Sequence, residues 1–209
     1  MRRLVLLLFG DFRISWLRTL LQLVRGHRIL IGRRFCLKGT PELVDERSRL
    51  TLGTRPYGFA TGRDDGILRV RGRLRIHGRV AIGVGSRIEV EPGALMDVGE
   101  DSYFSPNVRI IVSSGLTIGR GCAIGWDVQI LDDDQHVFRS GDRQRPRSAP
   151  IALGDHVWVG SKAMIFKGVE IADGCVVASG AVVTRSVDEP NSLIAGNPAS
   201  VVRRGIAWD

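Results

Sequence analysis

The sequence predicts an all-β solenoid, in which short strands wind around a triangular prism behind an N-terminal helical arm and ahead of a short C-terminal extension. Aliphatic residues recur at every sixth position over most of the chain. Glycine is abundant, at 26 of 209 residues, and aromatic residues make up only 6%, which suits many tight turns around a thin core. A hydrophobic content of 44% is enough for such a core and excludes a disordered chain.

The chain length is typical of one domain with an appended arm. We expect an amphipathic helical arm at 1–28, a repeat domain at 29–190 and a closing segment at 191–209. The three cysteines are too few and too scattered for a disulfide framework or a CxxC metal site. A reducing, cytoplasmic location is therefore expected.

Basic residues are concentrated near the N-terminus. Residues 1–80 carry 18 Lys and Arg against 6 Asp and Glu, a net charge of +12, while the rest of the chain carries 12 against 16, a net charge of −4. This asymmetry favours an anionic partner, such as a membrane surface, a nucleotide-linked substrate or a phosphate-bearing cofactor, although an arginine-rich surface also keeps a protein soluble. Nucleic acid is disfavoured, because no reader motif or interleaved aromatic pattern accompanies the basic residues.

The arm has the pattern of an amphipathic helix. Its polar positions recur at helical spacing, and they are Asp11, Ser15, Arg18, Gln22 and Arg25. The opposite side carries Phe12, Trp16, Leu17, Leu20, Leu21 and Val24, and Gly26 follows as the expected helix stop. The apolar run at 4–9 is too short to span a bilayer, and no signal-peptide cleavage site follows it. Two roles stay open: packing over the open end of the domain, or docking on a membrane surface through residues 4–25.

The rhythm of six is clearest towards the C-terminus. Its leading aliphatic residues there are Leu153, Val159, Ile165, Ile171, Val177 and Val183. A small or β-branched residue stands four places after each, at Val157, Ala163, Val169, Cys175, Ala181 and Val187. Upstream, the same spacing runs through Val70, Ile76, Ile82 and Ile88, then Val98, Phe104 and Ile110 with Ser102, Val108 and Ser114, then Ile118, Ile124 and Ile130 with Cys122 and Val128.

A period of six is neither helical nor a simple strand alternation. It predicts short strands along successive flat faces of a coil, with a turn after each strand. The leading residue and the small residue four places later both point inward, and stacked coils bury them in one narrow apolar column. Because Cys122 and Cys175 stand at inward positions, we expect them to be buried fillers rather than reactive thiols.

The rhythm lapses between Ile130 and Leu153. The stretch DDDQHVFRSGDRQRPRSAP has no inward aliphatic series and is rich in charged residues. It predicts a loop at 131–150 that leaves the coil, and solenoids often bind ligands on the side that carries such insertions. A lone histidine, His136, stands behind three aspartates in this loop.

The pattern [LIV]-G-x4 resembles that of the hexapeptide-repeat acyltransferases. WDVQILDDDQH (126–136) looks like the segment before the catalytic histidine of sugar and polysaccharide O-acetyltransferases, and LGDHVWVGSKAMI (153–165) is similar to hexads of galactoside and maltose acetyltransferases. SLIAGNPASVV (192–202) resembles the family's coenzyme A end. The resemblance implies a left-handed parallel β-helix, acetyl-CoA as the acyl donor without a metal, and a homotrimer with active sites between subunits.

The resemblance makes His136 the candidate general base. A sugar hydroxyl is a poor nucleophile, so its attack on a thioester needs a base within hydrogen-bond reach and donors for the oxyanion. Histidine suits this role because the unperturbed pKa of an imidazole lies near neutral pH. We expect His136 to deprotonate a hydroxyl of a sugar or cell-surface glycan precursor, and Asp134 to hold the imidazole or the substrate. No GxSxG elbow or Cys/His pairing indicates a covalent acyl-enzyme.

Further site residues follow from the resemblance. Asn107 matches an asparagine that binds the acceptor, although a turn residue is an equal interpretation. The positions that match acetyl-CoA contacts are Ser161, Ser179, Thr184 and Arg185, with a backbone N–H near Ser161 as the expected oxyanion donor. Trp158 resembles a tryptophan of the family beside the coenzyme groove, and Arg203 is an expected coenzyme contact through a phosphate. Packing between subunits would equally retain Trp158.

The coenzyme phosphates have three candidate partners, which are Arg185, Arg203 and Arg204. Solvated surface arginines are the alternative interpretation, chiefly for the last two. Ser200 stands where the family often has a basic residue, which weakens this assignment.

Three other functions stay open. N-acetylation of a nucleotide-linked amino sugar is performed by the same fold. A metalloenzyme similar to the γ-carbonic anhydrases needs three histidines converging on zinc, whereas His77, His136 and His156 are far apart in the sequence. A non-catalytic scaffold would need neither a base in the loop nor a coenzyme groove.

Overall fold

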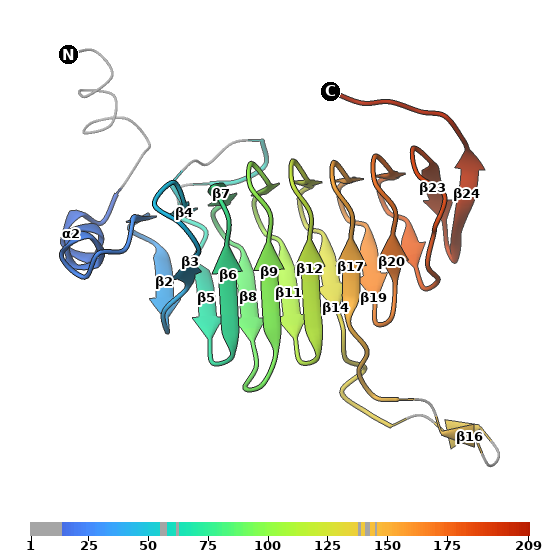
Figure 1. Ribbon diagram of the computed structural model, residues 1–209, viewed down its shortest axis with the longest axis horizontal. Helices are drawn as coiled ribbons and strands as arrows, with labels where there is room; N and C mark the ends of the chain where they lie inside the picture. Colours follow the sequence, from blue (N-terminus) through green and yellow to red (C-terminus); the bar gives the residue numbers. More distant parts are fainter. Residues whose placement is uncertain (1–13, 55–57, 62, 138, 141–142, 145) are drawn as a thin grey trace.

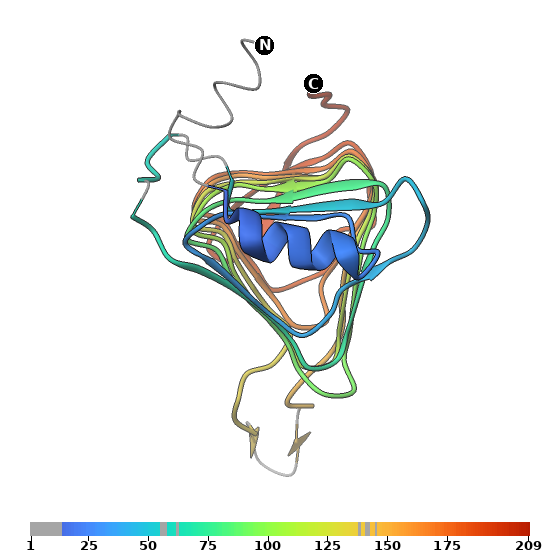
Figure 2. The ribbon, with the colours of Figure 1, turned by 90° about the vertical axis from the view of Figure 1, so that its left-hand side faces the viewer.

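The computed structural model describes residues 14–54, 58–61, 63–137, 139–140, 143–144 and 146–209. Within them the chain winds as a parallel β-helix with three flat faces, which Figure 1 shows from the side and Figure 2 along the axis. Each face is one hydrogen-bonded sheet whose strands come from successive coils. The solenoid predicted from the rhythm of six is therefore confirmed.

Face 1 is a nine-stranded sheet. It contains β1 (Ile29–Ile31), β4 (Arg49–Leu52), β7 (Arg79–Ile82), β10 (Tyr103–Phe104), β13 (Ala123–Ile124), β18 (Trp158–Val159), β21 (Val176–Val177), β23 (Leu193–Gly196) and β24 (Ala199–Arg203). Neighbouring strands of this face are parallel, apart from the antiparallel pair of β23 and β24 that ends it.

Faces 2 and 3 are parallel sheets of seven and six strands. Face 2 contains β2 (Phe35–Lys38), β5 (Gly66–Val70), β8 (Arg87–Val90), β11 (Arg109–Val112), β14 (Gln129–Leu131), β19 (Met164–Phe166) and β22 (Val182–Val183). Face 3 contains β3 (Glu42–Leu43), β6 (Arg73–Ile76), β9 (Leu95–Val98), β12 (Gly115–Ile118), β17 (Ile151–Leu153) and β20 (Glu170–Ile171).

Turns at the three corners join the faces, and we name each corner by the faces that it joins. At corner 1/2 the same turn position has a positive φ in successive coils, at Gly85, Asn107, Asp127, Lys162 and Gly180. Glycine adopts this conformation without steric cost, and Asn and Asp tolerate it better than other residues. The turn chemistry therefore repeats with the coil, as the strands do.

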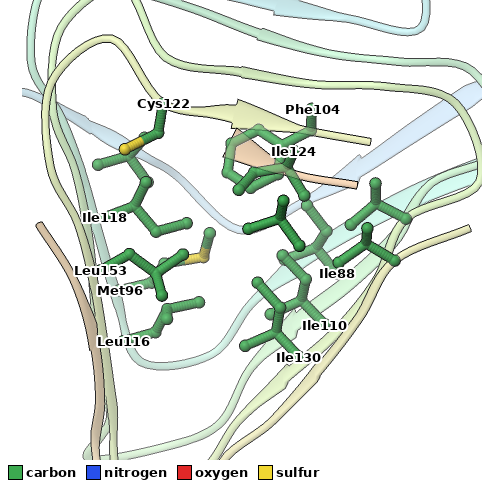
Figure 3. Close-up of a cluster of buried hydrophobic side chains, with 14 of the residues drawn as sticks. Ile88, Met96, Phe104, Ile110, Leu116, Ile118, Cys122, Ile124, Ile130 and Leu153 are labelled. Atoms are coloured by element: carbon green, nitrogen blue, oxygen red, sulfur yellow. The ribbon is translucent and has the colours of Figure 1, made fainter. Parts of the chain in front are cut away.

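The inward residues form one continuous column. All six leading aliphatics from Leu153 to Val183 are at most 3% exposed, and the upstream series is also buried. Figure 3 shows this packing around Ile110, Ile124 and Ile130. Ser114 was expected to point inward but is exposed, because it belongs to the turn that precedes β12.

Cys122 and Cys175 are fully buried, which confirms them as fillers of the column. Burial raises the pKa of both thiols, so the reactive thiolate is disfavoured. Cys36 is partly buried on β2. None of the three is disulfide-bonded.

The described part of the arm contains one helix, α2 (Trp16–Val24), which lies across the N-terminal end of the prism (Figure 2). It ends before Gly26, whose φ is 82°. Residues 4–13 of the arm, including Asp11 and Phe12, lie outside the described residues. In the described part of the chain, no helix is long and apolar enough to cross a bilayer.

The C-terminal segment returns along the outside of the prism after β24. Trp208 stacks on His156, with ring centroids 4.0 Å apart and an interplanar angle of 5°. The Trp208 indole N–H donates to the His156 carbonyl at 3.0 Å, and His156 Nε2 lies 3.0 Å from the Trp208 carbonyl oxygen. These contacts fix the chain end against corner 3/1.

Truncation of Ile110 to alanine should destabilise the protein by about 2–5 kcal/mol, because the rigid column cannot collapse into the cavity. Thr117→Ala is the matched control, since Thr117 points outward from a neighbouring strand and is exposed. Its effect should stay within about 0.5 kcal/mol. Equilibrium denaturation measures the free energy of unfolding of the two variants. An equal decrease for Ile110→Ala and Thr117→Ala would contradict the burial of Ile110 in the column.

Candidate active site

The loop predicted at 131–150 leaves the prism at corner 2/3, between β14 and β17 (Figures 1 and 2). Its two arms form an antiparallel stem, in which Asp133 bridges Ser148. The Asp134 N–H donates to the Arg147 carbonyl and the Ala149 N–H to the Asp132 carbonyl, each at 3.0 Å. A short hairpin of β15 (Arg139–Ser140) and β16 (Arg143–Gln144) lies at the tip.

Asp132 joins the base of the stem to the preceding coil. Its buried carboxylate accepts the backbone N–H groups of Ser113 and Ser114 at 2.7 Å and of Gly115 at 2.8 Å. Burial raises the pKa of this carboxyl and outweighs the three donors, which act to lower it. The exit of the loop is thus hydrogen-bonded to the turn beneath it.

Asp133 and Arg147 hold the two arms of the stem together. The Arg147 guanidinium donates to Asp133 Oδ2 at 2.7 and 3.0 Å, and the Gln135 N–H donates to Asp133 Oδ1 at 2.6 Å. The Asp133 side chain is only 1% exposed. Its burial acts to raise the pKa of the carboxyl, but Arg147 and the Gln135 N–H outweigh burial and lower that pKa.

Lys167, from the turn after β19 in the next coil, also ties both arms. Its ammonium group lies 2.5 Å from Asp134 Oδ2 and donates to the carbonyl oxygens of Pro146 and Arg147. The Lys167 side chain is 18% exposed. Asp134, expected to hold the imidazole or the substrate, therefore forms an ion pair with Lys167.

His136 follows directly after this anchored stem. Gln135 before it has a φ of 63°, which turns the chain sharply. His136 is exposed, and its ring has no hydrogen-bond or ion-pair partner among the described residues. The imidazole is therefore unpartnered within the described residues, while Asp133 and Lys167 hold the stem that precedes it.

Asn107, Ser161 and Ser179 lie together along corner 1/2, in three different coils. Ser161 and Ser179 occupy equivalent positions in adjacent coils, since Trp158 pairs with Val176. The N–H groups on either side of Ser161 are used: that of Gly160 donates to Val177 at 2.7 Å and that of Lys162 to Trp126 at 2.8 Å. The Ser161 N–H has no acceptor among the described residues.

The Asn107 side chain points back along the axis. A Cβ added at Gly85, in the preceding coil, would lie only 1.9 Å from Asn107 Oδ1. The φ of Asn107 is 64°, and its N–H donates to the Val84 carbonyl at 3.0 Å. These contacts fit the turn role considered for Asn107 and leave its amide nitrogen available to a ligand.

The remaining expected coenzyme contacts lie elsewhere on the prism. Thr184 and Arg185 are exposed just after β22, at corner 2/3, the corner that carries the loop. Trp158 is 43% exposed on face 1, 6.0 Å from Trp208 between ring centroids. Arg203 ends β24 and is exposed, while the neighbouring Arg204 donates to Glu189 at 2.8 Å.

The chain therefore divides the expected site between two corners. His136 lies on the loop from corner 2/3, and Ser161 with Asn107 lies on corner 1/2, with face 2 between them. The outer side of face 2 carries partly buried apolar residues, which are Ile67, Ile111, Leu131, Met164, Phe166 and Val182. Ile111, Leu131 and Phe166 stand in register on adjacent strands.

Sequence reasoning missed two features. The first is Lys167, which lies 31 residues from His136 in the sequence. No motif or repeat position distinguishes it from the other lysines. The second is Phe59, between β4 and β5, whose ring lies against Trp126 with ring centroids 6.3 Å apart. A gap in the rhythm between Leu52 and Gly66 was the available signal for this second feature.

No three or more His, Cys, Asp and Glu side chains are arranged to hold a metal ion within the described residues. His77 Nε2 lies 2.7 Å from Asp97 Oδ1, and His156 is stacked on Trp208. The three histidines considered for a zinc site thus lie in separate environments.

Comparisons with known proteins agree with this architecture. The model of the hexapeptide repeat of succinyl-transferase matches residues 150–185. An uncharacterised 24.8 kDa protein from the cps region of Klebsiella pneumoniae is 32% identical over 188 residues, which cover 90% of this chain and 84% of that protein. Galactoside O-acetyltransferase of Escherichia coli is 32% identical over 129 residues, which cover 57% of this chain and 62% of that enzyme.

A solved structure supports the fold independently. The polySia-specific acetyltransferase NeuO superposes with a TM-score of 0.54 over 88% of this chain and 79% of its own, at 23% identity. The predicted left-handed parallel β-helix is confirmed. With its repeat and these sequence similarities, the chain belongs to the hexapeptide-repeat acyltransferases, in the sugar acetyltransferase branch.

Proposed function

We propose that the protein transfers an acetyl group from acetyl-CoA to a hydroxyl of a sugar or cell-surface glycan precursor, with His136 as the general base. The observation that carries this proposal is the imidazole itself. It is exposed and unpartnered within the described residues, on a loop whose base is fixed by Asp132, Asp133 and Lys167. The similarity to galactoside O-acetyltransferase supports a sugar hydroxyl as the acceptor.

The reaction needs two functions that the two corners supply. His136 removes the proton from the acceptor hydroxyl as its oxygen attacks the thioester carbonyl. The Ser161 N–H, which has no acceptor among the described residues, donates to the carbonyl oxygen as negative charge develops there. The carbon–sulfur bond then breaks, the imidazolium returns its proton to the departing thiolate, and the ester and free coenzyme A leave.

The donor lies, in this proposal, along the C-terminal coils. Ser161 and Ser179 present short side chains in adjacent turns, so a narrow pantetheine arm passes close to the backbone. Trp158 offers an exposed ring on the neighbouring strand. Arg185 and Arg203 are exposed, and no side-chain carboxylate of the described residues pairs with either, so both are open to the phosphates.

A homotrimer joins the two halves of the site. Packing of a neighbouring subunit against the apolar outer side of face 2 covers Ile111, Leu131 and Phe166 and brings the loop of one subunit to corner 1/2 of the next. Face 2 also carries charged residues such as Arg69, Glu89 and Arg109. Face 3 suits such a contact less, because its outer side carries Arg75, Asp97 and Glu170 and has no apolar row like that of Ile111, Leu131 and Phe166.

His136→Ala should lower turnover by about 10²–10⁴-fold, since the base is lost while the exposed side chain contributes little to folding. Release of free coenzyme A thiol is measured with acetyl-CoA and a panel of sugars, amino sugars included. His27→Ala, another histidine outside both corners, is the control and should retain full activity. Transfer by His136→Ala at the normal rate would remove His136 from the mechanism.

Mixing two inactive variants tests whether the site lies between subunits. Trimers assembled from equal amounts of His136→Ala and Asn107→Ala should regain about a quarter of the normal sites, because a site that takes each residue from a different subunit is intact when both donors are wild-type. The rate after co-refolding measures this. No recovery on mixing would contradict the shared site, whereas full activity of Asn107→Ala alone would remove Asn107 from the site.

Lys167→Met should lower kcat by about tenfold or more, because both arms of the stem lose their anchor and His136 loses its position. The Michaelis constant for acetyl-CoA should change little, since Lys167 faces the stem rather than corner 1/2. Lys38→Met, at an exposed lysine on β2, is the control. A change in the Michaelis constant alone, with kcat intact, would contradict a positioning role.

A further inference from the structure

Helix α2 is attached to the prism by its polar side. Thr19 is its only buried residue, and Thr19 Oγ1 accepts the Ile31 N–H at 3.1 Å. The Arg18 guanidinium donates to the carbonyl oxygens of Phe35 at 2.8 Å and Arg33 at 2.7 Å. These hydrogen bonds fix the rotation of the helix about its own axis.

The apolar side of α2 consequently faces away from the protein. The exposed fractions of its large apolar residues are 53% for Trp16, 81% for Leu17, 59% for Leu20, 47% for Leu21, 52% for Leu23 and 77% for Val24. An amphipathic helix of a globular protein normally buries this side against the core. We call these six residues the outer face of α2.

The surroundings of the outer face are strongly basic. Residues 14–38 contain six Lys and Arg and no Asp or Glu. Arg18 is used to attach the helix, and Arg34 is paired with Asp65 at 2.8 Å. Arg25, Arg28 and Arg33 are exposed, and their side chains have no partner among the described residues.

We propose that the outer face of α2 docks on the surface of an anionic lipid bilayer. Leucine and valine side chains gain by leaving water for the acyl boundary, and the tryptophan ring suits the interface between headgroups and acyl chains. Unpaired arginines beside the same helix attract anionic headgroups. Neither a neutral apolar partner nor a purely electrostatic one explains both features.

The position of α2 allows this contact. The helix lies across the end of the prism, so a flat surface reaches it without meeting the faces or the loop at corner 2/3 (Figures 1 and 2). The docking is separate from the transfer reaction proposed above, and its test needs no enzymatic activity.

Co-sedimentation of the full chain with vesicles tests the proposal. Vesicles of phosphatidylcholine with phosphatidylglycerol should bind the protein at low salt, and added salt should weaken binding because the Debye screening length shortens. Vesicles of phosphatidylcholine alone should bind weakly. Failure to sediment with anionic vesicles at low salt, or equal binding to both kinds, would overturn the proposal.

Two variants separate the apolar and the electrostatic contributions. Leu17→Glu should weaken binding by about tenfold or more, since a leucine no longer enters the acyl boundary. Arg25→Glu should weaken it by about tenfold and reduce its salt dependence. Val202→Glu and Arg73→Glu, at exposed sites on β24 and β6, are the matched controls and should bind normally.

Thermal stability and sedimentation velocity identify other occupants of the outer face. Because Leu17 is 81% exposed, Leu17→Glu should leave the melting temperature unchanged. A clear fall in that temperature would mean that the protein itself covers the face. An oligomer that dissociates on Leu17→Glu would mean that a second copy covers it. Either result would overturn docking on a bilayer.

Discussion

The fold depends on the stacking of equivalent inward side chains in successive coils. Each inward side chain rests on the side chain at the same position of the next coil, so Ile110 lies over Ile130 and Ile130 over Ile165. The column is only a few side chains wide, and its leading aliphatic residues are 0–3% exposed over the six C-terminal hexads. A single coil buries almost nothing by itself, so register is enforced cooperatively along the axis. The corners inherit this register, and residues that occupy one turn position are aligned across many coils.

Alignment at the corners brings expected site residues from distant parts of the chain onto one edge of the prism. Asn107, Ser161 and Ser179 come together because each occupies an equivalent turn, and the turn geometry leaves the Ser161 N–H without an internal acceptor. The loop obeys a different rule. It leaves the repeat at one corner and is rebuilt as a two-armed stem by Asp132, Asp133 and Lys167. The reaction proposed above thus takes its oxyanion donor from the repetitive scaffold and its base from the non-repetitive loop.

The sequence was informative wherever the repeat applied. The rhythm of six predicted the buried column, the inward cysteines and the exit of the chain before His136, because each follows from spacing alone. Ser114 was assigned inward because it stands four places after Ile110. That position falls in the turn before β12. The ion pair of Asp134 with Lys167 could not be predicted, since it joins a loop to a different coil and follows no period.

The side on which α2 attaches to the prism could not be predicted either. An amphipathic pattern shows that the helix has a polar and an apolar side, but not which of the two contacts the protein. Hydrogen bonds from Arg18 and Thr19 decide that question.

The carboxylate of Asp132 has a consequence for substitutions in the loop that follows it. By accepting three N–H groups from the turn below, it closes the scaffold at the point where the loop departs. These hydrogen bonds do not depend on the length of the loop that follows Asp132. Residues of the loop beyond Asp132 are therefore exchangeable without loss of the hydrogen bonds that close the coil beneath it.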